Sequence, residues 1–334
     1  MRTSLSLFVA FTAVLALPVA LAESLDIKEW EVPYERSVPR DPFAESATSV
    51  WFVGQGGGYL ANLDAESGEF TRIPLKEGSG PHNLIVGSDG AVWYAGNLNR
   101  LIGRYDPATA AIEEIAMPDE AARDPHTLIF DEDEKHIWFT VQHGNMMGRL
   151  DVGSRSVDLI SSRTPGSRPY GIKLAPDGSV WVVLFGSNKL ARIDRNTLEH
   201  DEIELPHADS RPRRLEVLED GRVWYVDYSR GSLGVYNPTD ESFGEWPLPQ
   251  GERSLPYGMA SDSSGKLWMV ASGVQPNVFL GFDPATESFF SETEIESGGG
   301  TIRHMHYHEP SGTVWFGTDT NFVGRAVVEP GKQE

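Results

Sequence analysis

Residues 169–206 read PYGIKLAPDGSVWVVLFGSNKLARIDRNTLEHDEIELP, and this stretch decides the fold. It holds four short segments rich in β-branched and aromatic residues, with turn residues such as Asp-Gly and Gly-Ser between them. None of these segments shows the sustained period of a helix. The stretch therefore predicts four consecutive strands.

The same unit recurs seven times along the chain. Twelve or thirteen positions before a recurrent tryptophan stands a fixed point, which is proline in six copies and arginine in the last: Pro39, Pro81, Pro125, Pro169, Pro212, Pro256 and Arg303. The tryptophans themselves are 42 to 47 residues apart: Trp51, Trp93, Trp138, Trp181, Trp224, Trp268 and Trp315. Four strands repeated at this period predict an all-β protein, a seven-bladed β-propeller with four-stranded blades. We expect the tryptophans to pack between neighbouring blades.

The ends of the chain predict how the ring closes. The seventh unit runs from Arg303 to about Val328 and has three strands rather than four. Residues 27–32 read IKEWEV and resemble the fourth strand of the other units. Because an open ring would expose unpaired strand edges, we expect this N-terminal strand to complete the last blade.

The N-terminus has the pattern of a secretory signal. Arg2 precedes an apolar stretch from Leu5 to Leu17, and Ala20-Leu21-Ala22 offers a cleavage site. We therefore expect residues 1–22 to be a signal peptide and residues 23–334 to be one propeller domain, periplasmic or secreted. The alternative for residues 1–22, a membrane anchor, is disfavoured because the apolar stretch is short for a span.

Composition limits the partners. The chain has no cysteine, which excludes disulfides and thiolate metal sites, and its formal net charge is −21. Such an acidic surface repels phosphate backbones and anionic lipids, so nucleic acid is not an expected partner. We expect a monomer without a membrane span, whose partner is a small molecule or peptide.

The position after the fixed point varies between copies in an informative way. It opens the innermost strand of each blade, so its seven side chains should surround one mouth of the central channel. All seven are large and can form hydrogen bonds: Arg40, His82, His126, Tyr170, Arg213, Tyr257 and His304. We expect them to bind a polar or anionic ligand, and the alternative is that they only plug the channel.

The loops between second and third strands should lie around the same mouth. They add amides, an imidazole, a phenol, an alcohol, a guanidinium group and two carboxylates: Gln55, Asn97, Gln142, His143, Asp227, Tyr228, Arg230, Asp319, Thr320 and Asn321. In the last unit His304, His306 and His308 alternate along one strand and so share a face. A three-histidine metal site is one interpretation, although residues two apart on a strand are about 7 Å apart and do not easily meet one ion. The other interpretation, which this spacing favours, places His304 at the mouth and His306 and His308 deeper or at the blade interface.

The repeats resemble those of the virginiamycin B lyase (streptogramin lyase) family. The resemblance is carried by PYGIKLAPDGSVWVV at 169–183, NKLARID at 188–194, PHTLIF at 125–130, WFT at 138–140 and MGRLD at 147–151, and it extends over all seven units. It implies a seven-bladed propeller and a carbon–oxygen lyase that uses Mg²⁺ and opens a cyclic depsipeptide by β-elimination at its ester.

The family's site residues are matched only in part. His304 stands where the family has the histidine of Glu-Pro-His-Gly, and Ile302 replaces the glutamate of that motif. Tyr257 replaces a histidine of the preceding blade, and Thr318 replaces a metal-binding glutamate, with Asp319 beside it. The resemblance thus implies His304 as the base, with Tyr257 and Arg213 orienting the substrate. It implies that Asp227 or Asp319 would recruit Mg²⁺.

Three functions follow as alternatives. The first is a lyase-like propeller that binds a polar or anionic ligand at the channel mouth and carries out a metal-assisted elimination. The second is a non-catalytic ligand-binding or scaffold propeller, which the missing family glutamates favour. The third, a calcium-dependent lactonase of the gluconolactonase type, is the least favoured because the seven mouth positions include no acid.

Overall fold

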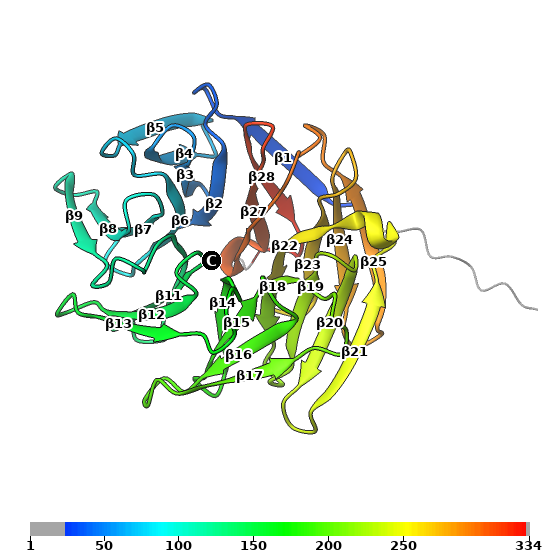
Figure 1. The fold of residues 1–334 in the computed structure, drawn as a ribbon. Helices are drawn as coiled ribbons and strands as arrows, with labels where there is room; N and C mark the ends of the chain where they lie inside the picture. The colour runs from blue at the N-terminus through cyan, green and yellow to red at the C-terminus, as the bar shows by residue number, and fades with distance from the viewer. Residues whose placement is uncertain (1–23, 332–334) are drawn as a thin grey trace, which may run out of the picture.

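The structure is a computed structural model that describes residues 24–331. It consists of seven four-stranded antiparallel sheets arranged as blades around a central axis (Figure 1). The predicted all-β, seven-bladed propeller is confirmed. The signal-peptide prediction for residues 1–22 lies outside the described residues. No helix among residues 24–331 is long and apolar enough to cross a membrane.

The first six blades follow one another along the chain, each with its strands in order from the axis outward. Blades 1 to 3 contain β2 (Pro39–Ala44), β3 (Ser49–Gly54), β4 (Tyr59–Asp64) and β5 (Glu69–Pro74); β6 (Pro81–Val86), β7 (Val92–Gly96), β8 (Leu101–Asp106) and β9 (Ala111–Ala116); β10 (Pro125–Phe130), β11 (His136–Val141), β12 (Met146–Asp151) and β13 (Val157–Ser161). Blades 4 to 6 contain β14 (Pro169–Leu174), β15 (Val180–Leu184), β16 (Lys189–Ile193) and β17 (His200–Glu204); β18 (Pro212–Val217), β19 (Val223–Asp227), β20 (Ser232–Asn237) and β21 (Ser242–Pro247); β22 (Pro256–Ser261), β23 (Leu267–Ala271), β24 (Val278–Asp283) and β25 (Ser288–Glu294).

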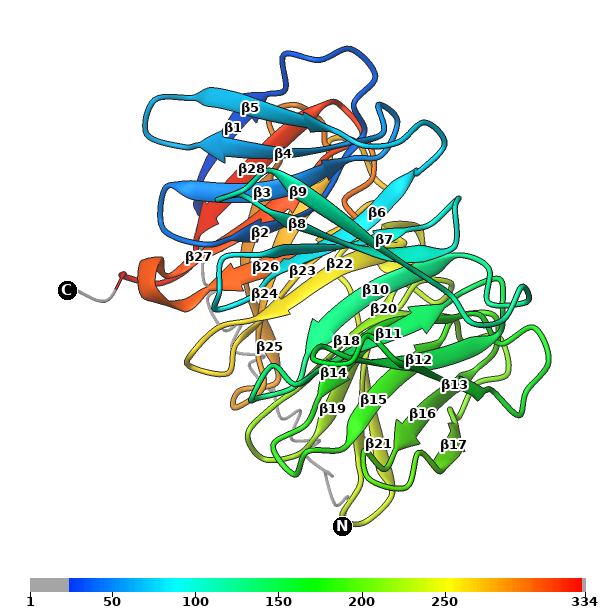
Figure 2. The same ribbon diagram turned by 90° about the vertical axis from the view of Figure 1, so that its left-hand side faces the viewer.

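Blade 7 is built from both ends of the chain. Its strand order is β26, β27, β28 and β1, from the axis outward. Trp30 pairs with Val323 in the antiparallel register of the last two strands, which lie side by side in Figure 2. The predicted closure by an N-terminal strand is therefore confirmed, with bounds one residue earlier than expected. The strands are β26 (Met305–His308), β27 (Thr313–Gly317), β28 (Phe322–Val327) and β1 (Asp26–Glu31).

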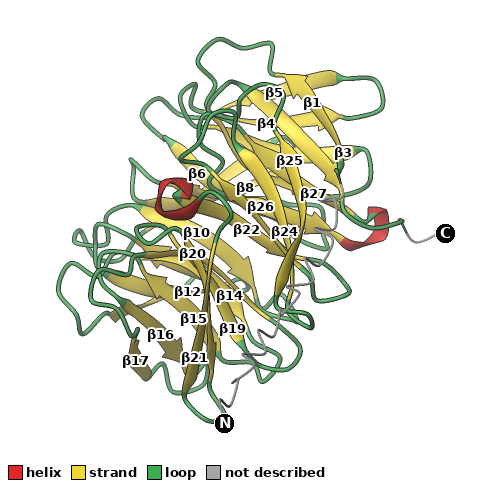
Figure 3. Ribbon diagram, turned by 90° about the vertical axis from the view of Figure 1, so that its right-hand side faces the viewer, coloured by secondary structure: helices red, strands yellow, loops and turns green. Residues whose placement is uncertain are grey.

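The two faces of the ring differ in the connections that they carry. The upper face, as we call it, carries the links between blades and the loops between second and third strands. The lower face carries the turns between first and second strands. Two short 3₁₀-helices mark these faces, η1 (Gly251–Ser254) on the upper and η2 (Glu309–Ser311) on the lower, and they lie on opposite sides of the ring in Figure 3.

The recurrent tryptophans lie in apolar clusters between neighbouring blades, and Trp138, for example, packs with Ile172 and Val182 of the next blade. All seven are buried, and six of them are at most 2% exposed. In four blades the tryptophan of the second strand is paired in register with an arginine of the third strand, as Trp138 is with Arg149. The Arg149 guanidinium carbon lies 5.7 Å from the Trp138 ring centroid, so the charged group covers the outer side of the indole. The predicted packing role of the tryptophans is confirmed.

A glycine in the third strand makes room for the residue after the tryptophan. A Cβ atom built on Gly103 would lie 2.0 Å from the ring of Tyr94, and one on Gly148 would lie 2.2 Å from the ring of Phe139. Neither ring could keep its place if the glycine carried a side chain. The Gly-Arg pair of the repeat therefore serves two aromatic residues, one on each face of the sheet.

The innermost strands of six blades contain a β-bulge at the same position. In six blades the pairing of the first two strands shifts just after the fixed proline, as between Pro125 and Leu128. Such a β-bulge changes the direction in which the following side chains point. In blade 7 the strand begins only at Met305, after the residue that corresponds to the bulge. These bulges determine which side chains face the axis.

We predict that Trp30 holds the closing strand in place. Its ring is 8% exposed and stacks on Trp315 with 5.5 Å between centroids. Replacing Trp30 by alanine should lower the free energy of unfolding by about 3 kcal/mol, because a large buried aromatic group is lost. Chemical denaturation measures the change. Phe243→Ala on the outer strand β21, where the ring is 37% exposed, is the control and should cost about 1 kcal/mol or less. Equal small losses for both variants would contradict this role for β1.

Candidate functional site

Seven side chains from the innermost strands meet at the axis near the upper face. We call them the upper ring, and they are the positions that follow the fixed point of each repeat: Arg40, His82, His126, Tyr170, Arg213, Tyr257 and His304. The ring centroids of His82 and His126 are 3.7 Å apart, and those of His126 and Tyr170 are 4.1 Å apart. The hydroxyls of Tyr170 and Tyr257 form a hydrogen bond across the axis. The structure thus brings these predicted residues together.

The upper ring fills the channel at its own level. His82, His126, Tyr170 and Tyr257 are 1–6% exposed, whereas Arg40, Arg213 and His304 keep part of their surface. The Arg213 guanidinium carbon lies 3.6 Å from the ring centroid of Phe185, 4.2 Å from that of Tyr228 and 4.4 Å from that of Tyr257. These contacts correspond to the plugging that was considered as an alternative for this position.

Burial keeps the histidines of the upper ring uncharged. Loss of solvent, followed by the charges of Arg40 and Arg214, holds the pKa of His82 well below its ordinary value. The pKa of His126 is lowered well below its ordinary value by burial and then by His82 and Arg214. Burial also raises the pKa of Tyr170. At neutral pH these rings are therefore neutral polar groups.

Arg214 crosses the axis directly beneath the upper ring. Its Nη1 donates to the Thr127 hydroxyl at 3.0 Å, its Nε donates to the Arg303 carbonyl at 2.9 Å, and its Nη2 lies 3.6 Å from the Asp41 carboxylate. Asn83 donates to the same carboxylate at 2.9 Å. One side chain from blade 5 thereby connects blades 1, 3 and 7.

Arg214 was not among the residues predicted from the sequence. The repeat pattern marks only the position after the fixed proline, which in blade 5 is Arg213. A signal was present, since Pro212-Arg213-Arg214 places a second cation on a strand whose neighbours carry small residues at that position, such as Gly171 and Gly258. In the structure, a Cβ on Gly171 would come within 3.3 Å of the Arg214 Cδ, so the small residue gives the arginine its path.

A second ring of seven residues lies below the first. We call it the lower ring, and each member is paired in register with the tryptophan of its blade: Phe43, Ile85, Ile129, Lys173, Glu216, Ala260 and His306. Blades 1 to 3 contribute apolar groups, and blades 4 and 5 contribute an ion pair. The nitrogen of Lys173 lies 2.8 Å from the Glu216 carboxylate, which also accepts from Ser261 at 3.2 Å.

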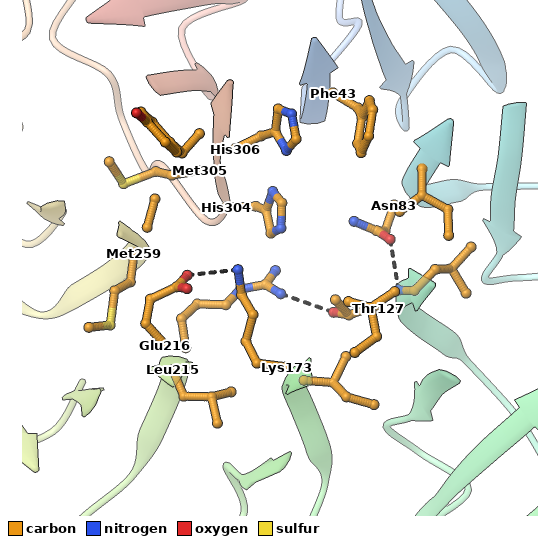
Figure 4. A pocket seen from close by; sticks show the side chains of 18 of the residues that line it. Phe43, Asn83, Thr127, Lys173, Leu215, Glu216, Met259, His304, Met305 and His306 are labelled. Atoms are coloured by element: carbon orange, nitrogen blue, oxygen red, sulfur yellow. Dashed lines mark hydrogen bonds and ion pairs between the residues drawn. The ribbon is translucent and has the colours of Figure 1, made fainter. Parts of the chain in front are cut away.

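The lower ring surrounds a cavity of about 450 Å³, which we call the axial cavity. Its upper end is lined by polar groups, namely Asn83, Thr127, Arg214 and His304, and its lower end reaches Glu134 and Tyr307 near the lower face. Figure 4 shows Lys173 and His304 directed toward the middle of this space, with Glu216 beside Lys173. The hollow part of the axis is therefore below the upper ring, on the side opposite to the predicted mouth.

Two of the three histidines of the last blade line the axial cavity. Burial, followed by the charges of Arg214 and Lys173, holds the pKa of His304 well below its ordinary value. Its buried Nδ1 has no hydrogen-bond partner among the described residues. His306 stacks on Phe43 at 4.2 Å, and burial lowers its pKa to about 3. His308 instead contacts the Ser311 hydroxyl at 2.7 Å, in the η2 turn.

The carboxylates predicted for a metal are engaged in the loops of the upper face. Asp227 is 2% exposed and accepts from the backbone of Arg211 at 2.9 Å and from the Ser229 hydroxyl at 3.2 Å. Asp319 forms an ion pair with Arg303. Within residues 24–331, no three His, Asp or Glu side chains gather closely enough to hold a metal ion. These donors do not fit a Mg²⁺ ion, which prefers several oxygen ligands and water.

The other residues predicted for the upper rim mostly hold their own loops. The Asn321 amide donates to the carbonyls of Val32 and Tyr34, at 2.9 and 3.2 Å, and Arg230 pairs with Asp209 and Glu245. Tyr228 packs edge-on against Tyr257 with 5.9 Å between centroids and so supports the upper ring. The rim residues therefore stabilise the loops around the upper ring, whereas the sequence indicated that they would face a ligand.

Comparison with known proteins agrees with this architecture. The model of the virginiamycin B lyase family matches residues 11–277. A structure of virginiamycin B lyase from Staphylococcus aureus superposes with a TM-score of 0.81 at 20% identity, covering 91% of this chain and 99% of that one. A streptogramin B lyase gives 0.80 at 21% identity, covering 90% and 97%.

A more distant similarity is found in a larger protein. The extracellular domain of a hybrid two-component system from B. thetaiotaomicron superposes with a TM-score of 0.68 at 15% identity, covering 93% of this chain and 44% of that one. No curated protein sequence gives a significant match. At these identities the solved structures show a shared fold.

We predict that Arg214 is the main electrostatic support of the axis. Arg214→Met should lower the free energy of unfolding by about 3–5 kcal/mol, because it leaves the buried Asp41 carboxylate without its cation. The double variant R214M/D41N should recover most of this loss, since asparagine keeps the hydrogen-bonding shape and tolerates the positive φ of 46° at this position. Both are measured by chemical denaturation.

Arg213→Met is the matched control for that prediction. Arg213 is adjacent in sequence and partly exposed, and it covers aromatic rings, so its loss should cost only about 1–2 kcal/mol. Equal losses for the two single variants, with no recovery in the double variant, would show that Arg214 acts through packing alone.

Proposed function

Because the chain belongs to the virginiamycin B lyase family, we propose that it uses the axis of its propeller to bind a small organic anion. The observation that carries this proposal is the sign of the charge at the axis. Five cationic side chains, Arg40, Lys173, Arg213, Arg214 and Arg303, lie in or beside the two rings with three carboxylates, Asp41, Glu216 and Asp319, and a fourth carboxylate, Glu134, lies at the lower end of the cavity. The axis is thus positive in a chain whose formal net charge is −21.

The position of these charges supports binding of an anion over a purely structural role. Exposed charges are screened over about 8–10 Å in physiological salt, whereas charges around a cavity with protein walls are screened much less. The local positive charge therefore decides which ligands enter, despite the acidic exterior. Buried polar atoms of His304 and Arg213 also lack partners within the described residues, which is the state expected of groups that hold a ligand or ordered water.

We predict that small organic anions stabilise the folded protein. Melting temperature is measured at constant ionic strength with carboxylates and phosphate esters, each beside its neutral analogue. An anion present at 100 times its Kd should add about 2.7 kcal/mol of stability, and its neutral analogue should add far less. Arg40→Met should reduce the effect of anions that reach the upper ring, and K173M/E216Q should reduce the effect of those in the axial cavity.

The control for this experiment is Lys76→Met, which removes an exposed lysine and should leave the response unchanged. Added Mg²⁺ should not shift the melting temperature, because Asp227 and Asp319 are already engaged. The proposal is wrong when no organic anion is distinguished from its neutral analogue.

The state of His304 favours a second function, elimination at a carbon–oxygen bond. A neutral imidazole with a partnerless Nδ1 in a cavity has a free lone pair for a proton from a carbon next to a carbonyl, although the lowered pKa of His304 makes it a weaker base than a free histidine. The released electron pair would form a carbon–carbon double bond while the carbon–oxygen bond breaks and a carboxylate leaves. Arg214 and Lys173 supply positive charge near the enolate. Tyr257, held by Tyr170, would keep only a positioning role in the upper ring.

We predict the outcome of a direct test of this elimination. A cyclic depsipeptide of the streptogramin B type is incubated with the protein, and the mass of the product is measured by mass spectrometry. Elimination opens the ring without a change of mass, whereas hydrolysis adds the mass of one water. His304→Ala should lower the rate by about 10²-fold or more. His308→Ala, which alters a histidine outside the cavity, should keep it. Unchanged opening by the His304 variant would remove this residue as the base.

We also propose that the protein is exported, as the pattern of residues 1–22 suggests. The fold is shared with an extracellular domain, which is compatible with this location. Sequencing of the protein recovered from outside the cytoplasm should begin at Glu23. A first residue of Met1 in that material would contradict cleavage after Ala22.

A further inference from the structure

The lower ring has two unlike sides. Blades 1 to 3 present Phe43, Ile85 and Ile129 to the axial cavity, whereas blades 4 and 5 present Lys173 and Glu216. In blade 6 the corresponding residue is Ala260, whose small side chain leaves space beside them. A ligand that matches this ring needs an apolar body on one side and a charged group on the other.

The charged side of the ring favours a single negative charge. The ammonium group of Lys173 has three donors, and its contact with Glu216 accounts for one of them. Its side chain is 36% exposed, while that of Glu216 is only 6% exposed. A carboxylate could therefore approach Lys173 from the cavity. A phosphate dianion would meet the Glu216 carboxylate nearby and be repelled more strongly.

The apolar side favours a flat body. Phe43 and His306 are stacked at 4.2 Å with 26° between their planes, so each ring covers one face of the other and the pair is left with ring edges and outer faces. The His306 imidazole is neutral at ordinary pH, since burial lowers its pKa to about 3. A planar aromatic ring can contact such an edge or outer face in the edge-to-face or offset-stacked arrangements that aromatic pairs prefer.

Access to the axial cavity is from the lower face. The upper ring separates the cavity from the upper face, because His82, His126, Tyr170 and Tyr257 are nearly without exposed surface. The lower end is lined by Glu134, Ser261 and Tyr307, which lie at or near the ends of the innermost strands on the lower face. A ligand can therefore reach the axial cavity from the lower face.

We infer that the ligand of the axial cavity is an aromatic monocarboxylic acid that enters from the lower face and places its carboxylate at Lys173. This inference rests on the anion binding proposed above and specifies its ligand class and its route. The volume of about 450 Å³ suits a body of one or two fused rings.

The test uses 2-naphthoate as the probe and isothermal titration calorimetry as the measurement. The neutral analogue 2-naphthamide and inorganic phosphate should each bind at least about tenfold more weakly, because the first lacks the charge and the second lacks the ring. K173M/E216Q removes the ion pair without leaving a lone buried carboxylate, and it should weaken 2-naphthoate by about tenfold or more.

Two tryptophan substitutions test the route. Ser261→Trp places a large group at the lower end of the cavity and should weaken or abolish binding of 2-naphthoate. Leu98→Trp alters a side chain that is 72% exposed on an upper-face loop, and it should have no effect. Circular dichroism establishes that both variants are folded before titration.

The results separate this inference from the broader proposal. Binding that is lost in Arg40→Met but kept in K173M/E216Q and Ser261→Trp places the ligand at the upper ring; anion binding then stands and the inference is wrong. If phosphate esters stabilise the protein but 2-naphthoate does not bind, anion binding also stands and the inference is also wrong. When neither 2-naphthoate nor any other organic anion binds, both are overturned.

Discussion

The buried contact of Arg214 with Asp41 is the interaction on which the centre of this propeller depends. Seven blades splay outward from the axis, so within residues 24–331 no backbone hydrogen bond joins opposite sides of the ring. A guanidinium group that reaches from blade 5 toward blades 1, 3 and 7 supplies that link with donors in several directions. Burial raises the pKa of Asp41, while Arg214 and the Asn83 amide act to lower it. The charge is tolerable at the axis only because these partners are held in place by four blades.

The outside and the inside of the ring carry opposite charge for different physical reasons. Acidic side chains lie on outer strands such as β9, β17 and β25, where Glu113, Asp201 and Glu292 are at the rim of the disc. Charged outer strands discourage edge-to-edge pairing with other chains. The cations at the axis, by contrast, sit among low-exposure walls where their field is little screened. The net charge of the sequence thus describes the surface and says little about the site.

The sequence predicts the architecture well because the architecture is repeated. Trp51 and its six equivalents mark the second strand of every blade, and the unmatched strand around Trp30 predicts the closure. The site is harder to predict because of the bulge after the fixed proline. Alternation of side chains cannot be counted across a bulge, so the places of Lys173 and Glu216 in the lower ring were not predicted. The sequence suggested that Asp227 could bind a metal ion, because its hydrogen bonds to Arg211 and Ser229 are formed only in the folded chain.

The closure of blade 7 also sets an order of events during biosynthesis. Trp30 is paired with Val323, so β1 leaves the ribosome long before β28, the strand that becomes its neighbour. Blades 1 to 6 can form as they emerge, because each uses a continuous stretch of chain. Until β28 has been made, β1 has no strand to pair with and the growing arc of blades has an open end. A factor that shields nascent segments would therefore act mainly on this strand.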